Sequence, residues 1–99
     1  MKNVHVEGHF RLLNNWLITL EGAPESVGRD FNCSYNHLTT LKGAPKSVGG
    51  HFDCNNNQLT SLEGAPKSVG GDFSCHSNAK KFTRNEVRAV CEVKGDIYT

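Results

Sequence analysis

The sequence predicts a solenoid of short parallel strands, and three observations lead to this fold class. The chain repeats itself with a period of 21 residues. Apolar, glycine, proline and asparagine positions recur together in every copy, so chance similarity does not explain the period. With 99 residues, 36% of them hydrophobic, the chain has too little apolar material for a large globular core. A solenoid needs no such core, because each repeat packs only on its neighbours.

Three full copies of the repeat occupy residues 17–79. They are LITLEGAPESVGRDFNCSYNH, LTTLKGAPKSVGGHFDCNNNQ and LTSLEGAPKSVGGDFSCHSNA. In each copy Phe-x-Cys alternates with polar residues, which is typical of a strand with one buried face. We expect these strands to stack in parallel, with the phenylalanine and cysteine side chains in the core. The asparagine that follows each strand is placed to satisfy backbone groups where the chain turns.

Each copy of the repeat contains two glycine-containing motifs, Gly-Ala-Pro and Ser-Val-Gly. Gly-Ala-Pro breaks regular structure, because proline lacks an N–H and restricts the residue before it. Ser-Val-Gly ends in a glycine in all three copies (Gly28, Gly49 and Gly70), which predicts a tight turn before the strand. The next position is Arg29 in one copy, so we do not expect the second glycine to be sterically required.

The N-terminal segment, residues 1–16, is predicted to be a divergent coil that caps one end of a single domain spanning residues 1–99. Shifting it by one period places Val6 in the column of Val27, and Phe10 in the phenylalanine column. Terminal repeats are expected to be atypical, because one of their sides faces water.

The C-terminal segment, residues 80–99, leaves the repeat pattern and is predicted to be a helix and tail cap. Thr83 and Glu86 have the spacing of a capping box, in which each side chain satisfies the other residue's backbone N–H. This pattern predicts a helix over about 84–92. The tail after Gly95 predicts a turn and a final short strand on the last coil.

The repeat also carries a family resemblance. Phe-x-Cys-x-x-Asn-x-Leu-x-x-Leu resembles the leucine-rich-repeat pattern L-x-L-x-x-N-x-L, and the short period with a late proline is similar to its bacterial subclass. The segment LTSLEGAPKSVGGDF-x-C resembles repeats of small bacteriophage and bacterial proteins. The resemblance covers about residues 17–78. It implies a leucine-rich-repeat solenoid, with a short curved parallel β-sheet and an irregular convex side, used as a binding scaffold rather than for a reaction.

Charge and hydropathy narrow the classes of partner. Lysine and arginine (11) nearly balance aspartate and glutamate (10), so we do not expect a nucleic-acid partner. No apolar run approaches the roughly 18–20 residues that a membrane span needs. The N-terminus is polar where a signal peptide is apolar, which predicts a cytoplasmic location, the host cytoplasm if the chain is phage-encoded.

The cysteines and histidines do not form a catalytic or metal-binding motif. Three of the four cysteines (Cys33, Cys54 and Cys75) share one buried column, and no C-x-x-C pair occurs, so we expect reduced structural thiols. The sequence contains no G-x-S-x-G, H-E-x-x-H or phosphate-loop motif. We therefore expect no enzyme activity, no catalytic or metal-ligating residues and no cofactor.

The outward strand columns are the candidate binding face, because the fold constrains them least. Leu13, Trp16 and Tyr35 are expected near the N-terminal end with polar groups around them, the usual setting of binding anchors. An alternative for Trp16 is that it seals the N-terminal cap. The candidate partner-binding residues are His9, Arg11, Leu13, Trp16, Asp30, Asn32, Tyr35, His51, Asp53, Asn55, Asp72 and His76.

The function predicted from these observations is a non-catalytic module that binds another protein, bacterial or host, and occupies part of its surface. The phage resemblance extends this to an inhibitor of a host or defence protein. Two alternatives stay open. One is a small metal-dependent protein that uses the histidines and aspartates of the outward face, His9, His51, His76, Asp30, Asp53 and Asp72. The other is a nucleic-acid contact through the basic residues of the C-terminal segment. The sequence also leaves a homo-oligomer open.

Overall fold

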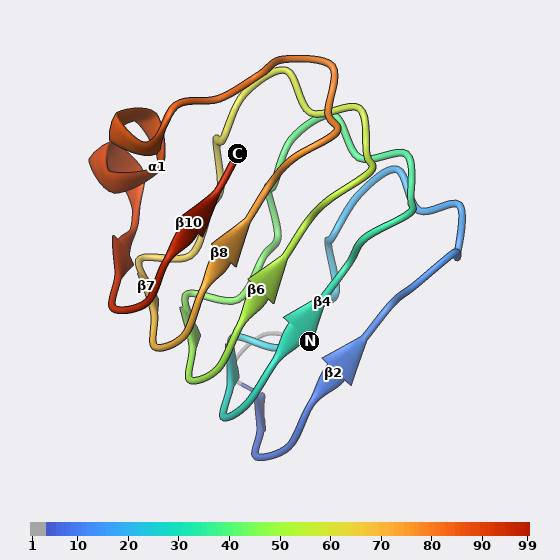
Figure 1. The fold of residues 1–99 in the computed structure, drawn as a ribbon. Helices are drawn as coiled ribbons and strands as arrows, with labels where there is room; N and C mark the ends of the chain where they lie inside the picture. Colours follow the sequence, from blue (N-terminus) through green and yellow to red (C-terminus); the bar gives the residue numbers. More distant parts are fainter. Residues whose placement is uncertain (1–3) are drawn as a thin grey trace.

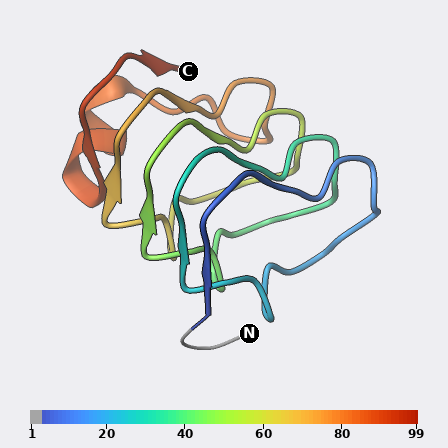
Figure 2. The same cartoon turned by 90° about the horizontal axis from the view of Figure 1, so that it is seen from below.

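The computed structural model describes residues 4–99 and shows a parallel-strand β-solenoid of about four turns with one short helix near its C-terminal end (Figure 1). Viewed from below, the coils lie side by side along one axis, and the helix lies at the end of the stack formed by the last coil (Figure 2). The predicted solenoid and its 21-residue period are therefore confirmed.

Within the described residues, ten strands of two residues each form two parallel five-stranded sheets. One sheet, with strand order β1-β3-β5-β7-β9, consists of His5–Val6, Ser26–Val27, Ser47–Val48, Ser68–Val69 and Glu92–Val93. The other, with strand order β10-β8-β6-β4-β2, consists of Ile97–Tyr98, Phe73–Ser74, Phe52–Asp53, Phe31–Asn32 and Phe10–Arg11. Sequence reasoning anticipated only the sheet of phenylalanine strands.

The register between coils is 21 residues over the first four coils and 24 residues at the last step, where Val69 pairs with Val93. Val6 pairs with Val27 and Phe10 with Phe31, which confirms a divergent coil within residues 4–16. Residues 1–3 of the predicted cap lie outside the described residues. The phenylalanine side chains form a continuous column in the core, with ring-centroid separations of 5.7, 5.6 and 5.1 Å along the stack. Ile97 continues the column after Phe73. The core is thus a set of apolar columns parallel to the solenoid axis.

The buried asparagines connect each coil to the one before it. The Asn57 side chain accepts a hydrogen bond from the Leu38 N–H at 3.0 Å and donates to the carbonyls of Cys33, Cys54 and Asn55 at 3.0–3.2 Å. Asn36 and Asn78 occupy the same column and make corresponding bonds to their own neighbours. The expectation that this column satisfies backbone groups at the turn is confirmed.

The glycines serve purposes other than those the sequence indicated. The left-handed turn lies in Gly-Ala-Pro, where Gly43 has a φ of 93°. Gly49 is needed instead because two coils approach each other closely there. A Cβ at this position would overlap the backbone carbonyl of Gly28 in the preceding coil. The expectation that the second glycine is dispensable is wrong at Gly50, where a Cβ would collide with the carboxylate of Asp30.

Helix α1 spans Arg84–Val90, two residues shorter than predicted at its C-terminal end. The Thr83–Glu86 capping box forms as expected, with both hydrogen bonds present. The helix ends because Cys91 is extended (φ −145°, ψ 135°) and leads into β9. The predicted final strand is β10, which pairs with β8. Within residues 4–99, no helix combines the length and the apolar character that crossing a membrane requires.

Candidate functional site

Two aromatic residues adopt a backbone conformation that such residues rarely adopt. The chain passes through the left-handed region just after each phenylalanine strand, at Asn14, Tyr35, Asn56 and Ser77, with φ between 55° and 60°. Asparagine tolerates this region well, whereas a bulky residue there is an outlier. Trp16 also lies there, with a φ of 57°. Strain of this kind is often retained at functional sites.

Both aromatic side chains face solvent. Tyr35 is 58% exposed and Trp16 is 78% exposed, so Trp16 does not seal the N-terminal coil and that alternative is wrong. The indole stacks on the imidazole of His37 in the next coil, with ring centroids 5.0 Å apart and planes 19° apart. The amide nitrogen of Gln58, one coil further, lies within hydrogen-bonding distance of His37 Nδ1, at 3.2 Å.

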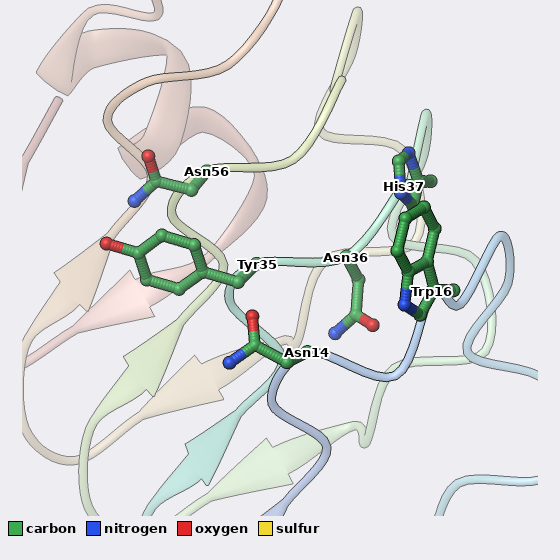
Figure 3. A pocket seen from close by; sticks show the side chains of 6 residues that line it. All are labelled: Asn14, Trp16, Tyr35, Asn36, His37 and Asn56. Carbon is green, nitrogen blue, oxygen red and sulfur yellow. The ribbon is translucent and has the colours of Figure 1, made fainter.

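These side chains border an open hollow with a volume of about 260 Å³. Tyr35 extends between Asn14 and Asn56, whereas Trp16 and His37 lie together on the opposite side (Figure 3). Asn36 lies between the two groups (Figure 3). The lining residues are Asn14, Trp16, Tyr35, Asn36, His37 and Asn56, and we call this feature the Tyr35–Trp16 hollow.

The floor of the hollow is rigid, because the Asn36 side chain is fully used by the fold. Its oxygen accepts hydrogen bonds from the N–H groups of Asn15 and Leu17, and its nitrogen donates to the carbonyl of Cys33 at 3.0 Å. A ligand at this place would therefore meet the other lining side chains rather than the Asn36 amide.

Of the predicted site residues, only Tyr35 and Trp16 line the hollow. Leu13 is 40% exposed and Arg11 is exposed on β2, and neither contributes to the lining. Sequence reasoning did not single out Asn14, His37 or Asn56. A signal was present, since these three residues share the repeat columns of Tyr35 and Trp16.

His9, Asp30, His51 and Asp72 occupy one column of the repeat. Their side chains have a structural role that sequence reasoning missed. The His51 N–H donates to Asp30 Oδ1 at 2.7 Å, and the Asp72 N–H donates to His51 Nδ1 at 2.9 Å. The Asp30 N–H donates to His9 Nδ1 at 3.2 Å, which extends the same pattern to the first coil. We call this column the His/Asp ladder. Its members join adjacent coils, and their side chains stay partly exposed.

The neighbouring columns are also used by the backbone. The carboxylate of Asp53 accepts the N–H of Asn55 at 3.0 Å, and Asn32 accepts the N–H of Ser34 at the same distance. Asn55 is only 8% exposed, so its predicted outward position is wrong; its side-chain oxygen accepts the N–H of His76 at 2.8 Å.

The four cysteines are free and buried, as expected for structural thiols. The thiols of Cys33 and Cys54 donate to carbonyls of the next coil at 3.4 Å. Burial raises the pKa of both thiols well above the usual value, and it raises the pKa of Cys75 and of Cys91 to about 11. These thiols are therefore protonated and poorly nucleophilic at neutral pH.

No group of three or more His, Cys, Asp or Glu side chains in residues 4–99 is arranged to hold a metal ion. Comparisons with protein-family models, with curated proteins and with solved structures find no match for the chain.

Proposed function

We propose that the protein is a non-catalytic protein-binding module of the leucine-rich-repeat type, and that it binds its partner through the Tyr35–Trp16 hollow. The observation that carries the proposal is the exposed Tyr35 at a left-handed position. The same column holds asparagine in the coils on either side, so the fold does not need an aromatic residue there.

Interface energetics support this choice of residues. Tyrosine and tryptophan are the most frequent energetic anchors in protein interfaces, because they bury a large area with few rotatable bonds. Trp16 is held in place by its stack on His37, so little conformational entropy is lost on binding. The repeat itself supplies the leucine-rich-repeat character, with Leu38, Leu41 and Leu59 fully buried beside the asparagine column.

The action that we propose is occupancy: the bound module covers part of the partner's surface. The resemblance of the repeats to those of small phage proteins supports a finer proposal, an inhibitor of a host or defence protein. The buried free thiols fit a reducing compartment such as the cytoplasm. The His/Asp ladder gives no support to a metal-dependent function, because its side chains are engaged with backbone N–H groups.

The test compares three chains as bait in the same lysate: wild type, Tyr35→Asn and Lys46→Glu. Asparagine at position 35 copies the residues of the neighbouring coils, and Lys46 lies outside the hollow, with its side chain 76% exposed. We expect a protein that wild type and Lys46→Glu retain and that Tyr35→Asn loses. With that protein purified, we expect the Tyr35→Asn change to weaken binding by about tenfold or more. Equal retention by all three chains would refute the proposed site.

A further inference from the structure

The chemistry of the Tyr35–Trp16 hollow indicates which kind of segment the partner presents, and this inference rests on the proposed function. We infer that the hollow takes an uncharged, proline-containing segment of the partner in the extended polyproline II conformation. Three properties of the hollow lead to this ligand class: its charge, its unused hydrogen-bonding groups and the state of its backbone.

Among residues 4–99, no aspartate, glutamate, lysine or arginine lines the hollow. Charged side chains of this face, such as Asp30 and Asp53, are engaged in the hydrogen bonds described above and lie outside the lining. A charged group that entered the hollow would be desolvated without an ion-pair partner, which costs free energy. The matching segment is therefore uncharged.

The unused polar groups of the hollow are rich in donors. Tryptophan Nε1 is only a donor, the tyrosine hydroxyl both donates and accepts, and each asparagine amide carries two donor hydrogens. The polar side-chain atoms of Trp16, Tyr35, Asn14 and Asn56 make no hydrogen bond within residues 4–99. Backbone carbonyls are the natural partners of such groups. A polyproline II segment exposes its carbonyls because it has no internal hydrogen bonds, and proline adds no N–H that needs an acceptor.

The backbone around the hollow is already paired, so the segment does not bind as an added strand. The Tyr35 N–H donates to the Asn55 carbonyl at 3.1 Å, and the His37 N–H donates to the Leu17 carbonyl at 2.8 Å. Strand addition needs an unpaired sheet edge, whereas polyproline segments bind through aromatic side chains. The two aromatic surfaces, Tyr35 on one side of Asn36 and the Trp16–His37 stack on the other, supply that kind of surface (Figure 3).

The experiment uses the full chain and its single tryptophan, Trp16, as the reporter. The probe is an oligoproline of ten residues with blocked ends, compared with a Gly-Ser peptide of the same length and with a neutral oligosaccharide. We expect saturable changes in Trp16 fluorescence and in its indole N–H chemical shift with oligoproline alone. The change should be lost in Tyr35→Asn and kept in Tyr98→Ser, which removes an exposed tyrosine outside the hollow.

Two results would overturn the inference. One is the absence of any change with oligoproline up to about 5 mM, at which a ligand with a Kd of about 1 mM occupies most sites. The other is a response to the oligosaccharide and not to the peptide, which would make the hollow a sugar site. If a purified partner depends on Tyr35 but oligoproline does not compete with it, the inference fails while the proposed function stands. If no partner depends on Tyr35, both fail.

Discussion

The carboxylate of Asp30 accepts a hydrogen bond from the backbone N–H of His51, 2.7 Å away and one coil further along the solenoid. The imidazole of His51 in turn accepts the N–H of Asp72, and the carboxylate of Asp72 accepts the N–H of Asp96. A side chain that accepts a hydrogen bond at this position therefore contributes to the fold, because it satisfies a backbone N–H of the next coil. Histidine and aspartate alternate from His9 to Asp72, so like charges are not stacked directly on each other over these four coils, whereas Asp96 follows Asp72 at the last step.

The first prediction concerns this ladder. Asp30→Ala removes the acceptor for the His51 N–H, and we expect the free energy of unfolding to fall by about 1 kcal/mol, since the group is partly exposed. Urea unfolding at neutral pH measures the change. Lys67→Ala, on an exposed position outside the ladder, serves as the control and should change it by less than about 0.5 kcal/mol. Equal values for the two variants would show that the ladder does not stabilise the fold.

The second prediction concerns the asparagine column. Asn57→Ala leaves one buried N–H and three carbonyls without the partner that the amide supplies, so we expect a loss of about 2–4 kcal/mol. Thermal and urea unfolding give the measurement. Gln58→Ala changes the exposed neighbour and is the control. A loss below about 1 kcal/mol for Asn57→Ala would mean that water replaces the amide in these bonds.

The third prediction follows from the raised thiol pKa values. Cys75 and Cys91 have a pKa of about 11 in the fold, against an ordinary value of 9.0. Between these two values the unfolded chain releases protons that the folded chain keeps, so the free energy of unfolding falls as pH rises from about 9 to about 11. Unfolding curves over this pH range test the sign. The variant Cys75→Ala should show a shallower decline than wild type, and an equal or steeper decline would contradict the assignment.

Sequence periodicity predicted the columns that face the core, because a 21-residue repeat keeps them in register over every coil. Phe10 and Val6 were found in this way despite the divergent first coil. Ser47–Val48 was not recognised as a strand, since two residues are too few to show an alternating pattern.

The errors have two physical causes, which are the short length of the strands and contact between coils. Asn55 was placed outward by continuing the alternation past Cys54, but β6 ends at Asp53 and the chain then turns inward. The need for Gly50 arises from the Asp30 carboxylate and the Arg29 backbone in the preceding coil. The stack of Trp16 on His37 likewise joins two coils. A pattern read along one repeat does not contain these relationships, because they depend on how closely the coils approach.

The last prediction separates the role of Tyr35 in binding from any role in folding. At a φ of 59°, asparagine is more favourable than tyrosine, whereas a β-branched residue is strained. Because Tyr35 is exposed, Tyr35→Asn should leave the free energy of unfolding unchanged or raise it by up to about 1 kcal/mol. Tyr35→Val should lower it by about 1 kcal/mol or more. Urea unfolding of both variants beside wild type gives the comparison. A loss of more than about 1 kcal/mol in Tyr35→Asn would show that the tyrosine is retained for stability, and the argument that places binding at this residue would no longer hold.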